Sequence, residues 1–291
     1  MKGRRAVTEQ KKHISATQLI MMGTCQIQYW FRYVNNVKAP PGIAQLKGSA
    51  VHGGAKENFH SKKKTREDLP RSQIIEISVN EFEMLFKKAG EISPTPEEAE
   101  MGISKAIGQA KDSVSILSGL FADKVAPCYQ PVLVEEKIPL SIPKSQYDLL
   151  AVVDLADDQD VVMDLKTGVK AKPQKEVEDS LQLTMYALVF KALTKRLPKE
   201  VRLETLVHKK EPDVQRLISN RDLGDLELLV RRINRMVEAI EKKVFQPTNP
   251  TNWQCSERWC GYAIQCPFYK HGDQEKKKYW LEKLLDEQLR Q

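Results

Sequence analysis

The pattern of apolar residues changes character near the middle of the chain. Three short segments rich in Val, Leu and Ile follow one another over residues 131–140, 147–155 and 161–166. Such runs, separated by polar turns, are typical of strands, and the acidic residues 157–160 supply a turn between the last two. The pattern therefore predicts a meander of strands in this region.

Beyond the meander, helical and strand patterns alternate. Residues 174–193 carry apolar positions at helical spacing, and residues 223–244 form a long amphipathic pattern of the same period. Two short apolar runs, at 201–207 and 215–219, predict further strands between these helices. The second half of the chain therefore combines strands with helices, as in an α/β fold.

Before the meander the pattern is helical. Ser15 and Gln18 have the spacing of a capping box, and the apolar residues after them predict a short helix that runs into Cys25. A second helical stretch begins near residue 48 and carries His52 in its first turns. Residues 78–124 are also helix-like and contain no cluster of chemically useful side chains. We interpret that region as a helical insertion.

Composition places the chain among ordinary globular proteins, with 41% hydrophobic and 29% charged residues. The basic stretch 1–12 lacks the apolar core of a signal peptide, and no apolar run is long enough to cross a bilayer. We therefore expect a cytoplasmic protein with no membrane partner. The net charge of +7 fits a polyanionic partner. Lysine runs at 62–64 and 276–278 are candidate contacts, although solvated lysine faces explain each run at least as well.

Cysteines are grouped in a way that suggests a shared cofactor. Cys25 stands near the start, and Cys255, Cys260 and Cys266 form the spacing C-x4-C-x5-C near the end. Clustered cysteines in an intracellular chain usually bind metal rather than form disulfides. Thiolate ligation leaves both zinc and an iron–sulfur cluster open. Cys128 lies outside this group and is expected to be a small buried apolar residue.

Two carboxylates and a lysine stand among the apolar strand residues of the meander. Side chains alternate along a strand, so Asp164 and Lys166 share one face. If the acidic turn pairs the two strands, Asp154 and Asp164 converge on one divalent ion. Carboxylate oxygens suit Mg²⁺ or Mn²⁺. The alternative is that Asp154 ends a strand and Asp164 pairs with Lys166, and from the hairpin alone the two interpretations stand about equal.

The order of the motifs resembles one family. The elements in chain order are the segment from Ile14 to Cys25, Gly48-Ser-Ala-Val-His52, Asp154, Asp164-Leu-Lys166, Gln182-Leu-Thr-Met-Tyr186, and Trp253-Gln-Cys255 through Cys266. Each is weak alone, but together they resemble the RecB-like branch of the PD-(D/E)XK nuclease superfamily. The similarity is to its iron–sulfur members, related to AddB-type and CRISPR-adaptation nucleases.

The resemblance implies a role for each matching residue. Asp154, Asp164 and His52 would be ligands of the catalytic metal, and Lys166 would position the water or stabilise the phosphate. Gln182 and Tyr186, four residues apart and so on one helical face, would contact DNA or brace the lysine. Both could equally be packing residues.

The chain departs from the family pattern at one metal-ligand position, and at a second position the sequence does not decide between two glutamates. The second acidic residue is Asp164, where many members have Glu. The family also often has a carboxylate on the preceding strand, and here Glu136 is the first candidate with Glu135 as the alternative, because alternation lets only one face the site. The aromatic residues 29–31 could stack on unpaired bases, although packing beside Cys25 is the more common use.

Taken with the resemblance, the cysteine spacing favours a [4Fe-4S] cluster over zinc, because zinc ribbons draw ligands from close C-x2-C pairs. The fold implied is a restriction-endonuclease-like core, a mixed sheet flanked by helices, with a cluster that clasps both ends. A single domain over 1–291 would comprise an insertion at about 61–127, the catalytic core at 128–220 and the cysteine segment at 245–270.

The function implied is Mg²⁺- or Mn²⁺-dependent hydrolysis of DNA, most simply by an exonuclease acting on ends or single strands in recombination, repair or phage-type DNA processing. The alternative is a catalytically silent DNA-binding or assembly subunit with the same fold. No P-loop string occurs in the chain. Any unwinding would therefore come from a helicase or recombination partner.

Overall fold

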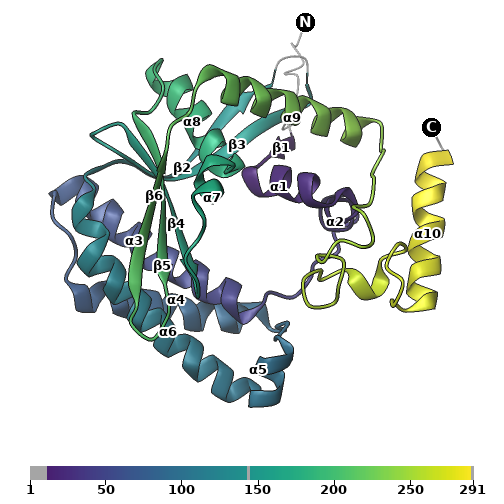
Figure 1. Cartoon of the computed structure of the whole chain (residues 1–291), viewed down its shortest axis with the longest axis horizontal. Coiled ribbons are helices and arrows are strands. Elements are labelled where there is room, and N and C mark those ends of the chain that lie inside the picture. Colours follow the sequence, from purple (N-terminus) through teal and green to yellow (C-terminus); the bar gives the residue numbers. More distant parts are fainter. Residues whose placement is uncertain (1–11, 143–144, 290–291) are drawn as a thin grey trace, which may run out of the picture.

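A mixed β-sheet runs through the centre of the larger, left-hand part of the molecule (Figure 1). The computed structural model describes residues 12–142 and 145–289, and within these residues six strands pair in the order β1-β3-β4-β5-β6, with β2 also paired to β3. The strands are β1 Lys12–Ile14, β2 Pro131–Ser141, β3 Tyr147–Asp157, β4 Val161–Gly168, β5 Glu200–Val207 and β6 Asp213–Ser219. The β1–β3 and β4–β5 pairs are parallel, and the others are antiparallel.

The five strands predicted from the sequence are all confirmed, with ends that differ by at most two residues. The strand that the sequence did not predict is β1, which has three residues and is too short to show a period. Of the basic stretch 1–12, all but Lys12 lies outside the described residues. None of the helices in the described part of the chain is long and apolar enough to cross a membrane.

Helices supply the remaining layers. They are α1 Ala16–Thr24, α2 Gln26–Tyr29, α3 Ile43–Thr65, α4 Arg71–Ala89, α5 Pro96–Met101, α6 Ile103–Lys124, α7 Gln174–Glu178, α8 Leu181–Thr194, α9 Leu223–Glu241 and α10 Gln274–Leu289, with short turns of other helix types at Trp30–Val34, Ala126–Cys128 and Ala263–Gln265. The capping box at the start of α1 is confirmed, because the Gln18 amide donates to Ser15 Oγ at 3.3 Å and the Ser15 amide to Gln18 Oε1 at 2.7 Å.

The sheet is covered on both faces. On one face α3, α4 and α6 bury Phe59 and Leu117 against the strand residues Leu155 and Leu165. The helices α4 and α6 lie within the expected insertion at about 61–127, and together with α3 they form one of the two covering layers. On the other face α1, α8 and α9 bury a second core, to which Val153 and Val162 contribute from the sheet. This arrangement agrees with the expected α/β fold of a mixed sheet flanked by helices.

The long helix expected at 174–193 is interrupted, and the interruption positions the site. The helical segments α7 and α8 are separated by Asp179 and Ser180. The Ser180 hydroxyl accepts a hydrogen bond from the Leu183 amide at 3.2 Å and so caps α8. Gln182 consequently lies in the first turn of a new helix.

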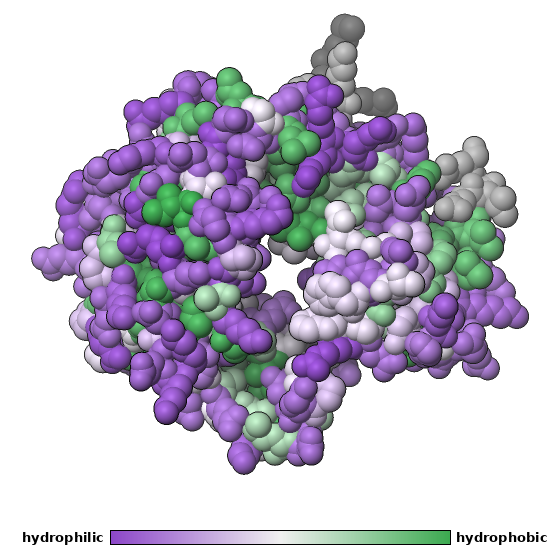
Figure 2. Space-filling view, viewed as in Figure 1, coloured by the Kyte–Doolittle hydropathy of each residue, from purple (hydrophilic) through white to green (hydrophobic). Residues whose placement is uncertain are grey.

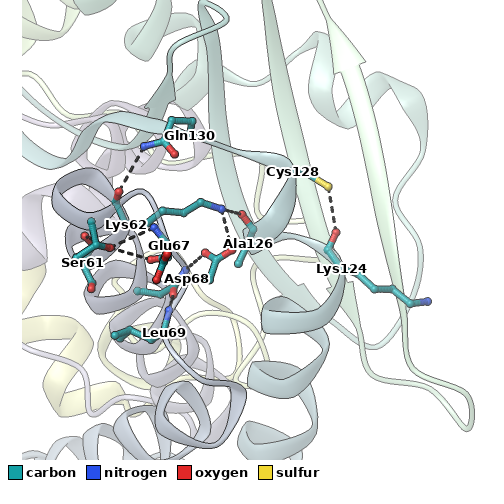
Figure 3. A network of polar contacts seen from close by, with 11 residues as sticks. Ser61, Lys62, Glu67, Asp68, Leu69, Lys124, Ala126, Cys128 and Gln130 are labelled. Carbon is teal, nitrogen blue, oxygen red and sulfur yellow. Dashed lines mark hydrogen bonds and ion pairs between the residues drawn. The ribbon is translucent and has the colours of Figure 1, made fainter.

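The lysine run at 62–64 is divided between the core and the surface, because Lys62 is buried whereas Lys63 and Lys64 are exposed. The Lys62 side chain is buried, and its Nζ donates to Asp68 Oδ2 and to the carbonyl of Ala126, both at 2.7 Å (Figure 3). Lys63 pairs with Glu136 at 2.7 Å. A buried ammonium is stable only when it is paired, so these contacts fix the end of α3 to the segment that leads into β2.

The expectation of a buried Cys128 is wrong. Its side chain is exposed, and Sγ lies 3.4 Å from the carbonyl oxygen of Lys124, one turn earlier (Figure 3). The helix α6 ends just before this residue, and the short turn Ala126–Cys128 directs Ala126 inward and the thiol outward. A preference for burial is an average over proteins, and this local geometry outweighs it.

Candidate active site

Asp154 and Asp164 lie where two strands of the sheet begin to separate. The strands β3 and β4 pair at Leu155 with Met163 and at Ala156 with Val162. The next positions in that register are Asp154 and Asp164. Beyond the last pair, Asp154 Oδ2 accepts a hydrogen bond of 3.2 Å from the Leu165 amide, which replaces the missing ladder bond. The hairpin therefore brings the two carboxylates together at its open end, as the sequence pattern predicts.

A continuous chain of hydrogen bonds joins these carboxylates to α8. Lys166 Nζ contacts Asp164 Oδ1 at 2.9 Å and donates to Gln182 Oε1 at 3.0 Å. The Gln182 amide donates to the Tyr186 hydroxyl at 2.6 Å, and that hydroxyl donates to Asp154 Oδ1 at 2.8 Å. All five residues predicted to take part in catalysis thus belong to one network, with each side chain oriented by its neighbours.

His52 and Glu135 approach Asp154 from the side of α3 and β2. His52 Nδ1 lies 3.6 Å from Asp154 Oδ2. One potential ligand atom from each of His52, Glu135 and Asp154 lies within 4.8 Å of the other two, and among the described residues this is the one group of at least three such side chains that close together. The trio and the hydrogen-bonded network share Asp154, which has His52 of α3 on one side and Tyr186 of α8 on the other.

The structure reverses the preference between the two glutamates. Glu136, the first candidate, points away from the trio and pairs with Lys63. Glu135, the alternative, stands with His52 and Asp154. Its φ of 48° is in the left-handed region, which is uncommon for a residue with a side chain. Regular alternation along the strand is broken at this residue, and no sequence signal predicts such a backbone.

Burial shapes the protonation of the site. Asp164 is 1% exposed, and burial raises its pKa strongly; the Lys166 ammonium counteracts this effect and the Asp154 carboxylate adds to it. Burial and then Asp154 also raise the pKa of Glu135. Burial lowers the pKa of His52, so its imidazole is neutral and able to act as a ligand. Clustered, desolvated carboxylates of this kind are stabilised by a cation.

Lys166 and Tyr186 respond to the same carboxylates. Burial lowers the pKa of Lys166, but Asp164 and Asp154 outweigh burial and the net shift is upward, so the side chain stays an ammonium. Burial followed by the two aspartates raises the pKa of Tyr186 well above its ordinary value, so its hydroxyl keeps the proton that it donates to Asp154. The two groups are therefore fixed donors beside the carboxyl groups of Asp154 and Asp164.

The network opens onto a cleft on the α7 and α8 side of the sheet. Its volume is about 650 Å³, and it is lined by Asp164, Lys166 and Gln182 together with Lys172 and Lys175 of the loop and helix that follow β4. Lys172 pairs with Glu176 at 3.4 Å and Lys175 with Asp179 at 2.9 Å. The cleft has room for a phosphodiester segment, with ammonium groups at its margin that suit phosphate.

The four predicted cofactor cysteines meet although they come from opposite ends of the chain. Cys25, Cys255, Cys260 and Cys266 line one cavity. The Gln28 amide donates to Cys260 Sγ at 3.5 Å. Burial raises the pKa of Cys260 to about 11, with further contributions from the other three thiols. Four thiols from opposite ends of the chain that line one cavity have the residue types of a metal-thiolate site.

The aromatic residues beside Cys25 are packed in the core rather than presented to a ligand. Tyr29, Trp30 and Phe31 are buried. Phe31 stacks on Tyr262 with ring centroids 5.2 Å apart, and Trp30 Nε1 donates to Glu287 at 2.7 Å. These contacts attach the N-terminal helices to the C-terminal segment, so the packing interpretation is confirmed for all three.

Comparisons with known proteins agree with this geometry. A family model described as the PD-(D/E)XK nuclease superfamily matches residues 13–267. A crystal structure of a candidate exonuclease from Eubacterium rectale is similar over 85% of this chain and 90% of its own, with a TM-score of 0.53 and 14% identity. That likeness concerns the fold alone.

A second solved structure, of the protein SSO0001, covers 89% of this chain and 88% of its own at 13% identity, but its TM-score of 0.42 is too low to support an argument. No curated protein matches the chain. The family match nevertheless spans every residue of the hydrogen-bonded network and all four clustered cysteines.

Proposed function

Because the chain belongs to the PD-(D/E)XK nuclease superfamily, we propose that it is a Mg²⁺- or Mn²⁺-dependent deoxyribonuclease that cuts DNA ends or single strands. The observation that carries the proposal is the arrangement around Asp154, which is shared by a potential cation trio and by a network that ends on a lysine. Both parts of the site border one another at the fork between β3 and β4.

Four side chains would hold the cation. Asp154 and Glu135 would supply carboxylate oxygens and neutral His52 a nitrogen. Asp164, which follows in the register opposite Asp154, would supply a further carboxylate oxygen. Oxygen donors suit Mg²⁺ and Mn²⁺, and the imidazole shifts the preference toward Mn²⁺. Bound there, a divalent cation would polarise a phosphate oxygen and lower the pKa of a water molecule.

The remaining network residues would act on the phosphate and on one another. Lys166 keeps its positive charge and lines the cleft, so its ammonium can contact the phosphate or orient a water molecule. Gln182 fixes Lys166, and Tyr186 fixes Asp154. Side chains held in this way need little rearrangement before reaction, which is how positioning residues contribute to rate.

The shape of the molecule supports action on single strands or ends. Figure 2 shows the molecule hollowed at its centre, between the sheet and the cysteine-bearing segment. The segment that follows α9 closes the ring on the side away from the sheet (Figure 1). A free strand can enter such a hollow from its end, and this accounts for the exonuclease activity that we propose. Recombination, repair and phage-type DNA processing all supply DNA ends.

We further propose that the four cysteines hold a [4Fe-4S] cluster. Zinc–sulfur bonds of about 2.3 Å in a tetrahedron place the sulfur atoms roughly 3.8 Å apart. In the described part of the chain no three of these thiols lie within 4.8 Å of one another, so the site is wider than zinc needs. Bound there, the cluster would join residues near both ends and stabilise the fold.

The experiment that tests the function is a cleavage assay with anaerobically purified protein. End-labelled single-stranded and duplex DNA are incubated with Mg²⁺, Mn²⁺ or EDTA. We expect cleavage with Mn²⁺ and Mg²⁺, none with EDTA, and products that shorten from an end. Binding without cleavage under every metal condition would instead favour the silent DNA-binding subunit.

A further inference from the structure

Two tryptophans of the cysteine segment are exposed. Trp253 and Trp259 have 64% and 60% of their surface accessible. Their rings are perpendicular with centroids 5.2 Å apart. The other two tryptophans, Trp30 and Trp280, pack against each other and Phe31 in the core. Two adjacent exposed indoles are unusual for a protein surface and indicate a binding site.

The backbone holds these side chains outward. The Cys255 amide donates to the Asn252 carbonyl and the Cys260 amide to the Ser256 carbonyl, each at 2.8 Å. Successive turns therefore fix the loop in which Trp259 lies between two thiols of the proposed cluster. In this loop both indoles are exposed.

A guanidinium group accompanies the rings. Arg258 lies over the Trp259 ring, with its Cζ 5.7 Å from the centroid. It also pairs with Glu97 of α5 at 3.1 Å. Both partners of this ion pair are exposed, so the pair is weak and its arginine is available to an anion. The patch formed by Trp253, Arg258 and Trp259, which we call the tryptophan patch, thus combines aromatic faces with a positive charge.

The segment that carries the patch borders the central hollow. In Figure 1 the chain between α9 and α10 lies across the opening from α7 and the sheet. The cleft that holds Asp164 and Lys166 is lined on that opposite side by residues of α7. A strand that occupies the cleft and passes through the opening would meet the cysteine segment.

We propose that the tryptophan patch is a stacking platform for unpaired bases of the DNA strand that feeds the cleft. This inference rests on the proposed nuclease function and specifies where the substrate strand is held outside the cleft. Every base has a π face, so stacking on indole tolerates any sequence, and the arginine can contact a base or the adjoining phosphate.

The test is DNA binding in EDTA, where cleavage is absent. Affinities for a labelled oligothymidylate and for an abasic oligomer of the same length are measured for the parent protein and for Trp253→Ala and Trp259→Ala. We expect each variant to bind oligothymidylate about tenfold more weakly and the abasic oligomer with unchanged affinity. Trp259→Phe should retain most of the affinity, because a smaller ring still stacks.

A matched control is available on α10. Tyr279 is an exposed aromatic residue with 58% of its surface accessible, outside the patch. Tyr279→Ala should bind both oligomers as the parent does. Unchanged melting temperature of the Trp variants shows that the loop has not unfolded.

Three results would overturn the inference. The first is unchanged oligothymidylate affinity in a variant that carries both Trp253→Ala and Trp259→Ala. The second is an equal loss of affinity for the abasic oligomer. The third is a change of oligomeric state in the Trp variants with DNA affinity intact, which would make the patch a protein interface. Binding is measured without metal, so the two proposals can fail separately. A parent protein that binds DNA through the tryptophan patch but never cleaves it would contradict the proposed nuclease function and still support the stacking platform.

Discussion

The Tyr186 hydroxyl donates a hydrogen bond of 2.8 Å to Oδ1 of Asp154 and so connects α8 to the fork of the strands. The other oxygen of Asp154 accepts from the Leu165 amide and faces His52. Asp154 is therefore held by both covering layers of the sheet. Its orientation depends on the Tyr186 hydroxyl and the Leu165 amide, neither of which is a proposed cation ligand, as well as on His52.

Removing this hydroxyl tests that dependence. Tyr186→Phe leaves the ring but deletes the bond to Asp154, and we expect cleavage to fall by about 10- to 100-fold, as for other groups that orient metal ligands. The Mn²⁺ concentration for half-maximal activity should rise. Tyr279→Phe, which alters an exposed ring elsewhere, serves as the control. An unaltered metal requirement in Tyr186→Phe would mean that Asp154 needs no such support.

Neighbouring glutamates provide a matched pair for the cation site. Glu135→Gln should weaken Mn²⁺ binding by about tenfold or more, because Glu135 belongs to the trio around Asp154. Glu136→Gln should leave binding unchanged, because that side chain pairs with Lys63. Isothermal titration with Mn²⁺ distinguishes the two. The reverse order of effects would restore Glu136 as the ligand.

Burial of Asp164 predicts a conflict between stability and activity. The pKa of Asp164 is raised in the folded protein, so the folded chain holds this proton more tightly than the unfolded chain does. The contribution of this proton to the free energy of unfolding is fully present below the pKa of the unfolded state, near 4. It is lost as the pH rises through the raised pKa of the folded state. In EDTA, Asp164→Asn should therefore melt on the order of 4 °C above the parent at pH 8, and the gap should narrow toward pH 5.

Lys166 would not offset this gain, because its ammonium keeps the bond to Gln182 and reaches solvent. The same variant should have lost cleavage. Calorimetric scans across this pH range provide the measurement, and an Asp164→Asn protein that is less stable than the parent at every pH would show that the charged pair stabilises the fold.

Substitution of a cysteine in the proposed cluster site should lower iron content and thermal stability together. Cys25→Ala or Cys260→Ala removes one thiol from the shared cavity, and we expect lower iron content together with a lower melting temperature. Cys128→Ala is the internal control, because its exposed thiol lies elsewhere. Anaerobic protein should be brown, with about four irons per chain. Colourless protein with stoichiometric zinc and no iron uptake on reconstitution would refute the cluster.

Regular patterns allowed most of the fold to be predicted. Strands β2 to β6 and helix α9 have clear apolar periods. The capping-box spacing of Ser15 and Gln18 predicts the start of α1. The network residues could be placed because strand alternation and the four-residue helical spacing determine which side chains share a face. These are local rules, so they need no knowledge of the tertiary structure.

Other features depend on tertiary context. Glu135 faces the site through a positive φ that its residue type disfavours. Lys62 is buried because Asp68 and the Ala126 carbonyl surround its ammonium, whereas a run of three lysines indicates exposure. The exposure of Trp253 and Trp259 likewise depends on the turns of the cysteine segment, because tryptophan side chains are buried in most proteins. Sequence patterns carry no signal for such contacts.

The most direct test of the account is the single-turnover cleavage rate of Lys166→Ala with saturating single-stranded DNA and Mn²⁺. Lys166 joins the network to the cleft and is not among the proposed cation ligands, so its loss should slow cleavage by at least about 100-fold with DNA affinity and Mn²⁺ affinity retained. Lys175→Ala, at the cleft margin, should remain within a few-fold of the parent. Cleavage by Lys166→Ala at the parental rate would contradict the assignment of this site as the nuclease centre.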